Sequence, residues 1–248
     1  MGGKPSFYCY LGFYHFVSQI LISRSLYNDR DVMVQIISYL FKRTLSGQMI
    51  KGMIFDFGNV ICRFDNRVFI RSISKHGPLS EAEMLKRLYI ESGVPEEYET
   101  GKISSREFYE KVKALLGLDM DIDEFRGAFT SIFYPVTETL ELVRNLKGKY
   151  KLALLSNTNE WDHEHAIKNV GIYPLFDAVS LSYELGVKKP DERIYLDCMD
   201  KLGLEPEECV YIDDIREYAE KASDLGMIGY HYVDHDRLLE FLNHLLPG

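Results

Sequence analysis

The clearest candidate for chemistry in this chain is a single carboxylate at the end of an apolar run. Asp56 follows Met53-Ile54-Phe55 and precedes a turn that contains Gly58. A parallel strand buried on both faces reads as a continuous apolar run, and ligands of open α/β sheets bind just beyond the carboxyl ends of such strands. Asp56 therefore lies where such proteins usually carry out their chemistry.

Three further groups of polar residues follow Asp56 along the chain. They are Ser156-Asn157-Thr158-Asn159 after the apolar run 150–155, Lys188-Lys189-Pro190 in a loop, and Asp213-Asp214 after the run 210–212. Taken singly, each group is common in turns, loops and exposed surfaces. Their joint occurrence in this order favours a functional site.

Together with Asp56, these groups resemble the motifs of the haloacid dehalogenase-like (HAD) hydrolases, over about residues 50 to 233. The segments 56–60, 156–159 and 183–195 look most like a sugar-phosphatase-like subgroup related to α-glucose-1-phosphate phosphatase. The resemblance implies an α/β fold, in which a Rossmann-like parallel sheet core carries an inserted helical cap that selects the substrate. It also implies a phosphatase of small phosphorylated metabolites such as sugar phosphates, which acts through an aspartyl-phosphate intermediate.

By this resemblance, Asp56 is the nucleophile that attacks phosphorus. Lys189 and Ser156 are the other catalytic residues and hold the phosphoryl oxygens, and Asn157 and Asn59 are further phosphate-binding residues, together with Gly58. A phosphate dianion repels an attacking carboxylate, so such a site needs cations that neutralise both groups and hold them in line.

The resemblance also implies a magnesium site. Asp56 and Asp214 would bind Mg²⁺ through their carboxylates and Gly58 through its backbone carbonyl, because this ion takes a few oxygen ligands and keeps several waters. Asp213 would orient Lys189 or a metal-bound water. Tyr218 stands where the family often carries Asn or Asp. This difference affects the expected outer coordination shell of the metal and not the metal ligands themselves.

The general acid/base of the family is missing from its usual position. A second aspartate stands there two residues after the nucleophile, and this chain has Gly58. A positioned acid/base contributes about 10²–10⁴ in rate, so either another group serves or some activity is lost. Asp65 is the nearest carboxylate downstream and a possible acid/base, although it also fits the N-cap of the following helix.

The elements that must position these residues follow from hydrophobic periodicity. Residues 66–135 predict about four helices and no strand, with capping boxes at Ser80-x-x-Glu83 and Ser104-x-x-Glu107. From residue 136 onward, short apolar strands (150–155, 179–182, 210–213, 228–233) alternate with helical segments (among them 137–147 and 236–246), which is typical of a parallel sheet with helices on both faces. We therefore predict a core domain of residues 49–65 and 136–248, interrupted by a helical cap of residues 66–135.

The amino-acid composition limits which classes of molecule this protein is expected to bind. The 248 residues are 46% hydrophobic, which is enough for a core, and 29 basic against 38 acidic residues give a net charge of −9. Phosphate binding on nucleic acids or anionic membranes needs a basic surface, so we expect neither partner but a small phosphate ester. The four cysteines form no C-x-x-C pair, which favours a reducing, cytoplasmic compartment. The oligomeric state is left open.

Residues 1–48 do not share the pattern of the core. The aromatic stretch 7–22 is shorter than the roughly 20 residues of a membrane-spanning helix and contains His15 and Gln19. No small-x-small cleavage site of a signal peptide follows it. Two readings stay open: an accessory helical extension, or a start placed upstream of the natural one at Met49.

Two other functions compete with the phosphatase. A 2-haloacid dehalogenase would use Asp56 against carbon without a metal, but the Asp-x-Tyr-Gly-Thr turn usual in those enzymes is absent. A phosphate-ligand binding protein with lost or weak turnover would explain Gly58. His163 and His165 are two residues apart and so point apart on a helix, which predicts solvated or outer-shell histidines, and Trp161 beside them is expected to pack.

Overall fold

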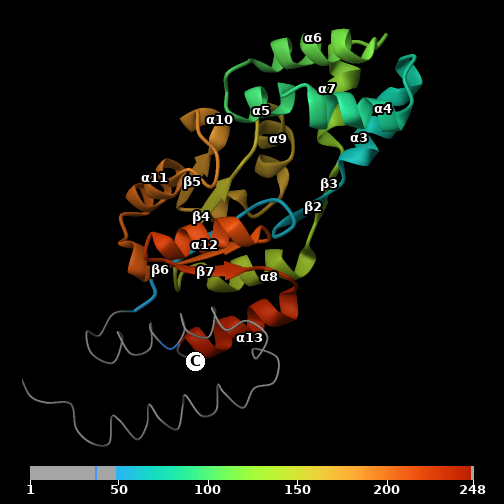
Figure 1. The fold of residues 1–248 in the computed structure, drawn as a ribbon. Coiled ribbons are helices and arrows are strands. Elements are labelled where there is room, and N and C mark those ends of the chain that lie inside the picture. Colours follow the sequence, from blue (N-terminus) through green and yellow to red (C-terminus); the bar gives the residue numbers. More distant parts are fainter. Residues whose placement is uncertain (1–36, 38–48, 247–248) are drawn as a thin grey trace, which may run out of the picture.

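The computed structural model describes residues 49–246, together with Ile37 (Figure 1). The expectations for the aromatic stretch 7–22 and for the extension 1–48 lie outside these residues, Ile37 apart. Within the described part of the chain, no helix is long and apolar enough to cross a membrane.

Five strands form the central sheet, and every neighbouring pair is parallel. Their order is β5 (Ala178–Leu181), β4 (Lys151–Ser156), β1 (Gly52–Phe55), β6 (Cys209–Asp213) and β7 (Ile228–His231). The predicted α/β class with a parallel sheet is confirmed. Because β1 lies in the middle, it has β4 on one side and β6 on the other, so the three strands that end in predicted site residues are neighbours.

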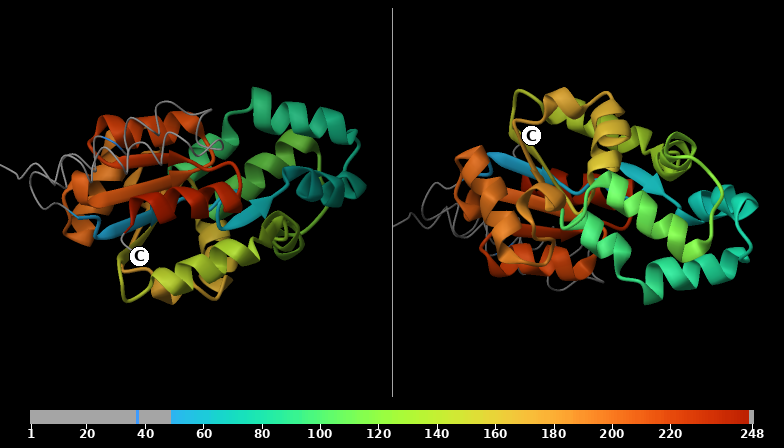
Figure 2. Two further views of the ribbon diagram at one scale, coloured as in Figure 1. Left: turned by 90° about the horizontal axis from the view of Figure 1, so that it is seen from below. Right: turned by 90° about the horizontal axis from the view of Figure 1, so that it is seen from above.

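Helices cover both faces of this sheet (Figure 2). Successive side chains of a strand point to opposite faces. Met53 and Phe55 pack on the face that is covered by α8 (Thr137–Leu146) and α13 (His235–Leu245). Ile54 packs on the other face, with α11 (Glu192–Leu202) and α12 (Arg216–Asp224). This two-sided burial explains why β1 is a continuous apolar run rather than an alternating one.

A second group of helices lies beyond one end of the sheet (Figure 1). It contains α3 (Asn66–Ile73), α4 (Glu81–Leu85), α5 (Val94–Glu99), α6 (Ser105–Leu116) and α7 (Ile122–Thr130). We call residues 66–132 the helical subdomain. Its own apolar cluster includes Phe69, Phe108, Phe125 and Phe129, with Phe69 and Phe129 ring centroids 5.1 Å apart.

Local signals account for the helix ends of this subdomain. The capping box at Ser104 is present, with reciprocal bonds between Ser104 and Glu107, and α6 ends at Gly117 in the left-handed conformation. The Ser80 side chain caps α4 by accepting a hydrogen bond from the backbone N–H of Glu83. Each such cap typically stabilises a helix by about 1 kcal/mol.

The prediction of no strand between residues 66 and 135 is wrong. β3 (Phe133–Pro135) pairs antiparallel with β2 (Cys62–Phe64), and this ribbon joins the subdomain to the sheet. A three-residue strand is too short to show an alternating pattern, and its partner lies about 70 residues away in the sequence. α7 accordingly ends at Thr130, just before β3.

The subdomain is attached to the sheet domain through α9 (Glu160–His165), which follows β4. Trp161 of α9 is 7% exposed and packs in the apolar cluster of the subdomain, as expected for a packing residue. Its backbone N–H donates to the Tyr98 hydroxyl over 3.1 Å. Gly101 lies against the backbone of Tyr183, where a Cβ would be only 2.1 Å from the Tyr183 carbonyl oxygen.

Candidate active site

The ends of three neighbouring strands bring the predicted residues together. Asp56 directly follows β1, Ser156 ends β4 and Asp213 ends β6. The backbone N–H of Asp56 donates to the Ile212 carbonyl over 2.9 Å, which continues the ladder between β1 and β6 and sets Asp56 level with Asp213. All three side chains are buried.

The ammonium group of Lys189 joins the two carboxylates. It donates to Asp56 Oδ1 over 2.8 Å and to Asp213 Oδ2 over 2.7 Å, and only 1% of its surface is exposed. The Asn157 side chain holds the backbone on both sides of this lysine, since its Oδ1 accepts from the Lys189 N–H over 2.8 Å and its Nδ2 donates to the Lys189 carbonyl over 3.3 Å. Asn157 therefore positions the lysine, and its predicted contact with phosphate stays a prediction.

Charges in this site perturb one another. Burial alone lowers the pKa of Lys189, but the nearby charges of Asp56 and Asp213 outweigh it, and the net shift is upward. The lysine is therefore held as a cation despite its burial. Burial raises the pKa of Asp56, and the positive charge of Lys189 opposes this rise. A cation bound beside Asp56 would favour its ionised, nucleophilic form.

Both carboxylate oxygens of Asp213 accept hydrogen bonds. Besides Lys189, its Oδ2 accepts a short hydrogen bond from the Tyr211 hydroxyl, and its Oδ1 accepts from the Ile215 N–H over 2.8 Å. The ring of Tyr218 covers the same ammonium group, with 5.1 Å between Lys189 Nζ and the ring centroid. Asp213 thus contacts Lys189 directly, and its role in orienting that lysine stays a prediction.

The residues fit a hard cation that prefers oxygen ligands. One carboxylate oxygen from each of Asp56, Asp213 and Asp214 can be chosen so that all lie within 4.8 Å of one another. Since Asp213 is already engaged, Asp56 and Asp214 are the carboxylates available to an ion. Asp214 Oδ2 accepts from Asn59 Nδ2 over 2.9 Å, so the Asn59 side chain braces a candidate ligand. Magnesium suits such an all-oxygen donor set.

An aromatic ring lies close to the position of the missing acid. A Cβ on Gly58 would lie 3.0 Å from Cε1 of Phe64 and 3.8 Å from Asp56 Oδ2. Asp65, the predicted alternative acid, caps α3 by accepting from the Arg67 N–H over 2.9 Å, and it does not line the cavity described below. The structure thus places it in the N-cap role, and its acid/base role stays a prediction.

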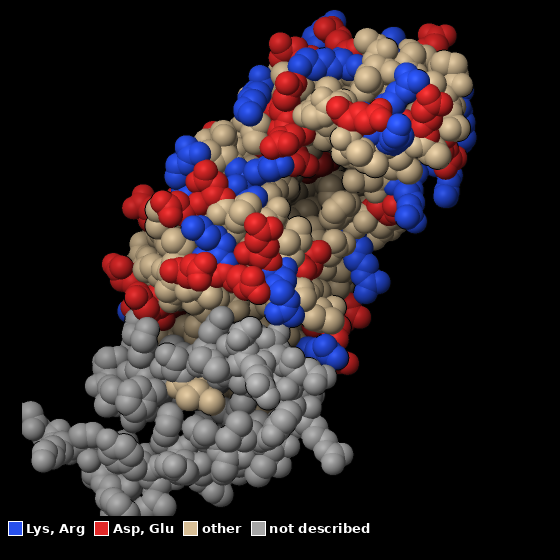
Figure 3. All heavy atoms as spheres, viewed as in Figure 1, with Lys and Arg blue, Asp and Glu red and all other residues tan. Residues whose placement is uncertain are grey.

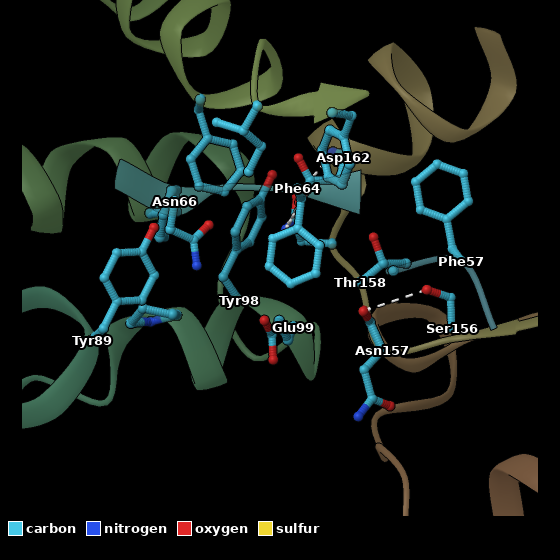
Figure 4. A pocket seen from close by; sticks show the side chains of 17 residues that line it. Phe57, Phe64, Asn66, Tyr89, Tyr98, Glu99, Ser156, Asn157, Thr158 and Asp162 are labelled. Carbon is cyan, nitrogen blue, oxygen red and sulfur yellow. Dashed lines mark hydrogen bonds between the residues drawn. The ribbon is translucent and has the colours of Figure 1, made fainter. Parts of the chain in front are cut away.

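A cavity of about 110 Å³ opens beside these residues, between the helical subdomain and the sheet domain (Figures 3 and 4). Gly58 and Ser156 line it from the sheet, and Tyr89 and Glu99 line it from the subdomain. Aromatic rings form much of its wall. Its size suits a small molecule and not a macromolecular chain.

Sequence reasoning missed several polar residues around this cavity, among them Asp162, Glu99 and Tyr89. A signal for Asp162 existed, because it follows three residues after Asn159, the N-cap of α9, whose side chain accepts from the Asp162 N–H. No hydrophobic periodicity in the sequence marks Glu99 or Tyr89 as cavity residues, because the cavity is lined by segments that are far apart in the chain.

The histidine beside Asp162 is buried and not solvated. His163 is 4% exposed, and its two ring nitrogens lie 2.9 Å from the hydroxyls of Tyr183 and Tyr173. The expectation of a solvated histidine is therefore wrong for His163, because Tyr173 and Tyr183, on either side of β5 in the chain, contact its ring.

Comparison with known proteins gives a consistent family. A family model of the haloacid dehalogenase-like hydrolases matches residues 50–217. D-ribitol-5-phosphate phosphatase of Bacteroides thetaiotaomicron is 30% identical over 185 residues, which cover 72% of this chain and 89% of that enzyme. Glyceraldehyde 3-phosphate phosphatase of Methanocaldococcus jannaschii is 24% identical over 200 residues, or 73% of this chain and 83% of that enzyme.

Solved structures agree with this comparison. The crystal structure of a HAD family enzyme of Bacteroides thetaiotaomicron superposes with a TM-score of 0.68 at 27% identity, covering 77% of this chain and 99% of that one. The complex of that enzyme with magnesium and inorganic phosphate superposes with a TM-score of 0.64 at 27% identity, covering 76% and 98%.

Proposed function

Because this chain belongs to the haloacid dehalogenase-like hydrolases, we propose that it hydrolyses phosphate monoesters of small metabolites in a Mg²⁺-dependent reaction. The observation that carries the proposal is the position of the Lys189 ammonium between Asp56 and Asp213, 2.8 and 2.7 Å away. A buried cation beside a buried carboxylate is what an attack on a phosphate dianion requires. The relatives that are named as sugar-phosphate and polyol-phosphate phosphatases support the same class of substrate.

In this reaction Asp56 attacks phosphorus, and the bond from phosphorus to the leaving oxygen breaks. The leaving oxygen takes a proton, and water then attacks the phosphorus of the aspartyl-phosphate, loses a proton and releases inorganic phosphate. Ser156 and Lys189 hold the phosphoryl oxygens. Asp56, Asp214 and the Gly58 carbonyl would hold the ion. When bound, Mg²⁺ would neutralise charge on the phosphoryl group and orient it for in-line attack.

Activity assays with two variants test this mechanism. Asp56→Asn removes the nucleophile with almost no change in shape, so we expect turnover to disappear while the far-ultraviolet circular dichroism stays unchanged. Asp214→Asn should raise the Mg²⁺ concentration needed for half-maximal activity, because one of the two carboxylate ligands proposed for the ion is lost. Glu164→Gln, which changes an exposed carboxylate outside the site, is the control and should retain activity. Turnover by Asp56→Asn would exclude the covalent mechanism, and loss of turnover in Asp65→Asn would restore Asp65 as the acid.

A second function is a phosphate-ester binding protein with weak turnover. It is favoured by one observation, the Phe64 ring beside Gly58 where an acid would stand. Calorimetric binding of a phosphate ester in Mg²⁺, without release of inorganic phosphate over hours, would identify it.

We also infer a reducing, cytoplasmic compartment. It is supported by the free, buried thiols of the cysteines that the structure describes, Cys62, Cys198 and Cys209.

A further inference from the structure

Asp162 is a buried carboxylate with an unused hydrogen-bonding atom. The residue is 8% exposed and lies in the first turn of α9. Its Oδ2 accepts from Asn159 Nδ2 over 2.7 Å, whereas its Oδ1 has no hydrogen-bond partner among the described residues. A buried acceptor without a partner costs about 1–3 kcal/mol, so such atoms are usually satisfied by a ligand, an ion or a water.

This carboxylate lines the same cavity as Ser156 and Gly58 (Figure 4). The cavity therefore extends from the residues proposed to hold the phosphoryl group to a carboxylate without a cation beside it. A phosphate ester whose phosphoryl group lies at Ser156 would place its leaving group in the remainder of the cavity, toward Asp162.

Three other polar side chains line the leaving-group side. No hydrogen bond joins the side chain of Glu99, Tyr89 or Asn66 to another described residue, and each is partly buried in the cavity wall. A carboxylate only accepts, whereas a phenol hydroxyl and a carboxamide both donate and accept. A ligand that satisfies this set must offer donors and acceptors together.

Hydroxyl groups meet this requirement, because each donates one hydrogen bond and accepts others. An ammonium group only donates, so it would satisfy the carboxylates but not the donors of Tyr89 and Asn66. The aromatic wall, which includes Phe64, Tyr98 and Phe129, is suited to the apolar carbon atoms between hydroxyls.

We propose that the leaving group is a polyhydroxylated carbon skeleton, a polyol or sugar, and that Asp162 determines this specificity by accepting a hydrogen bond from one of its hydroxyls. The inference rests on the proposed phosphatase function and adds the residue that recognises the hydroxyl groups of the leaving group. Asp162 contacts the leaving group and not the phosphoryl group, so it affects the choice between substrates rather than the chemistry common to all of them.

The test compares substrates that differ only in hydroxyl groups. We would measure kcat/KM in Mg²⁺ for ribitol 5-phosphate, for pentyl phosphate, which has the same carbon chain without hydroxyls, and for p-nitrophenyl phosphate. The enzymes are wild type, Asp162→Asn and the control Glu164→Gln, which changes an exposed carboxylate of the same helix. Asn keeps the shape and the bond to Asn159 but loses an acceptor.

At pH 8, where Asp162 is ionised, we expect kcat/KM of Asp162→Asn for ribitol 5-phosphate to fall about 10-fold to 100-fold, as for a lost hydrogen bond to a charged group. The values for pentyl phosphate and p-nitrophenyl phosphate should stay within about twofold, and Glu164→Gln should change none of the three. Equal losses on all substrates would show a structural role and overturn the inference. A wild-type preference for phosphoethanolamine over ribitol 5-phosphate would overturn the polyol class in favour of an ammonium group.

Failure of the phosphatase proposal would be visible separately, as absence of turnover of p-nitrophenyl phosphate. Titration calorimetry of ribitol 5-phosphate into wild type and Asp162→Asn then tests the recognition alone. A dissociation constant 10-fold or more weaker in the variant supports the inference, and equal constants overturn it.

Discussion

Replacing Asp162 by Asn should make the free protein more stable, and the gain should grow with pH. Burial raises the pKa of Asp162 from its ordinary value of 3.8 to about 7. The hydrogen bond from Asn159 opposes this rise, and the negative charge of Glu99 adds to it. The folded state therefore keeps this proton to a higher pH than the unfolded chain does. By linkage, the free energy of unfolding falls as pH rises from about 4 to about 7, and the loss is complete above that range.

The size of the effect follows from the two pKa values. A rise from 3.8 to about 7 corresponds to a loss of up to about 4 kcal/mol at alkaline pH. Asn is uncharged throughout and can still accept from Asn159. The difference in unfolding free energy between Asp162→Asn and wild type should therefore increase by up to about 4 kcal/mol between pH 4 and pH 8. Tyr89, Tyr98 and Glu99 face the same carboxyl and are present in both proteins, so their own titrations largely cancel.

The assay is urea denaturation followed by circular dichroism, without Mg²⁺ or phosphate, at several pH values. Glu164→Gln is the control: the Glu164 carboxylate is exposed and the hydrogen bond from Lys168 lowers its pKa, so its removal should not stabilise the protein at alkaline pH. A difference between Asp162→Asn and wild type that stays constant with pH would refute the reasoning, because it would mean that Asp162 is ionised in the folded state over the whole range.

Two further predictions concern glycines. Gly58→Asp should speed cleavage of primary alkyl phosphates by about tenfold or more, but only when Phe64→Ala removes the ring that lies 3.0 Å from the new Cβ. Single-turnover kinetics of the two single variants and of the double variant measures this effect. An equal gain in rate without Phe64→Ala would contradict the prediction. Gly101→Ala should separate the subdomain from the sheet domain, because φ is +64° and the Cβ would be 2.1 Å from the Tyr183 carbonyl. Gly93→Ala at φ +69° has open space and should cost only the about 1–2 kcal/mol of the left-handed conformation; equal melting temperatures of the two alanine variants would show that the Gly101 contact is unimportant.

The sequence by itself predicted the strands of the sheet, with ends that differ from the observed ones by one or two residues. The apolar run before Asp56 is continuous because Met53 and Phe55 face one layer of helices and Ile54 the other. Burial, periodicity and capping are local properties, and a local pattern is sufficient to predict them. The same holds for the helix that begins at Ser104.

Only the tertiary structure decided which of these ends meet. Lys189 reaches both Asp56 and Asp213 because β1 and β6 are neighbours, and strand order is not a property of any local segment. For the same reason the sequence could not place Asp162 and Glu99 around one cavity, since they come from the sheet domain and the helical subdomain. Contacts between residues that are far apart in the chain depend on how whole elements pack together, and no local pattern in the sequence shows that packing.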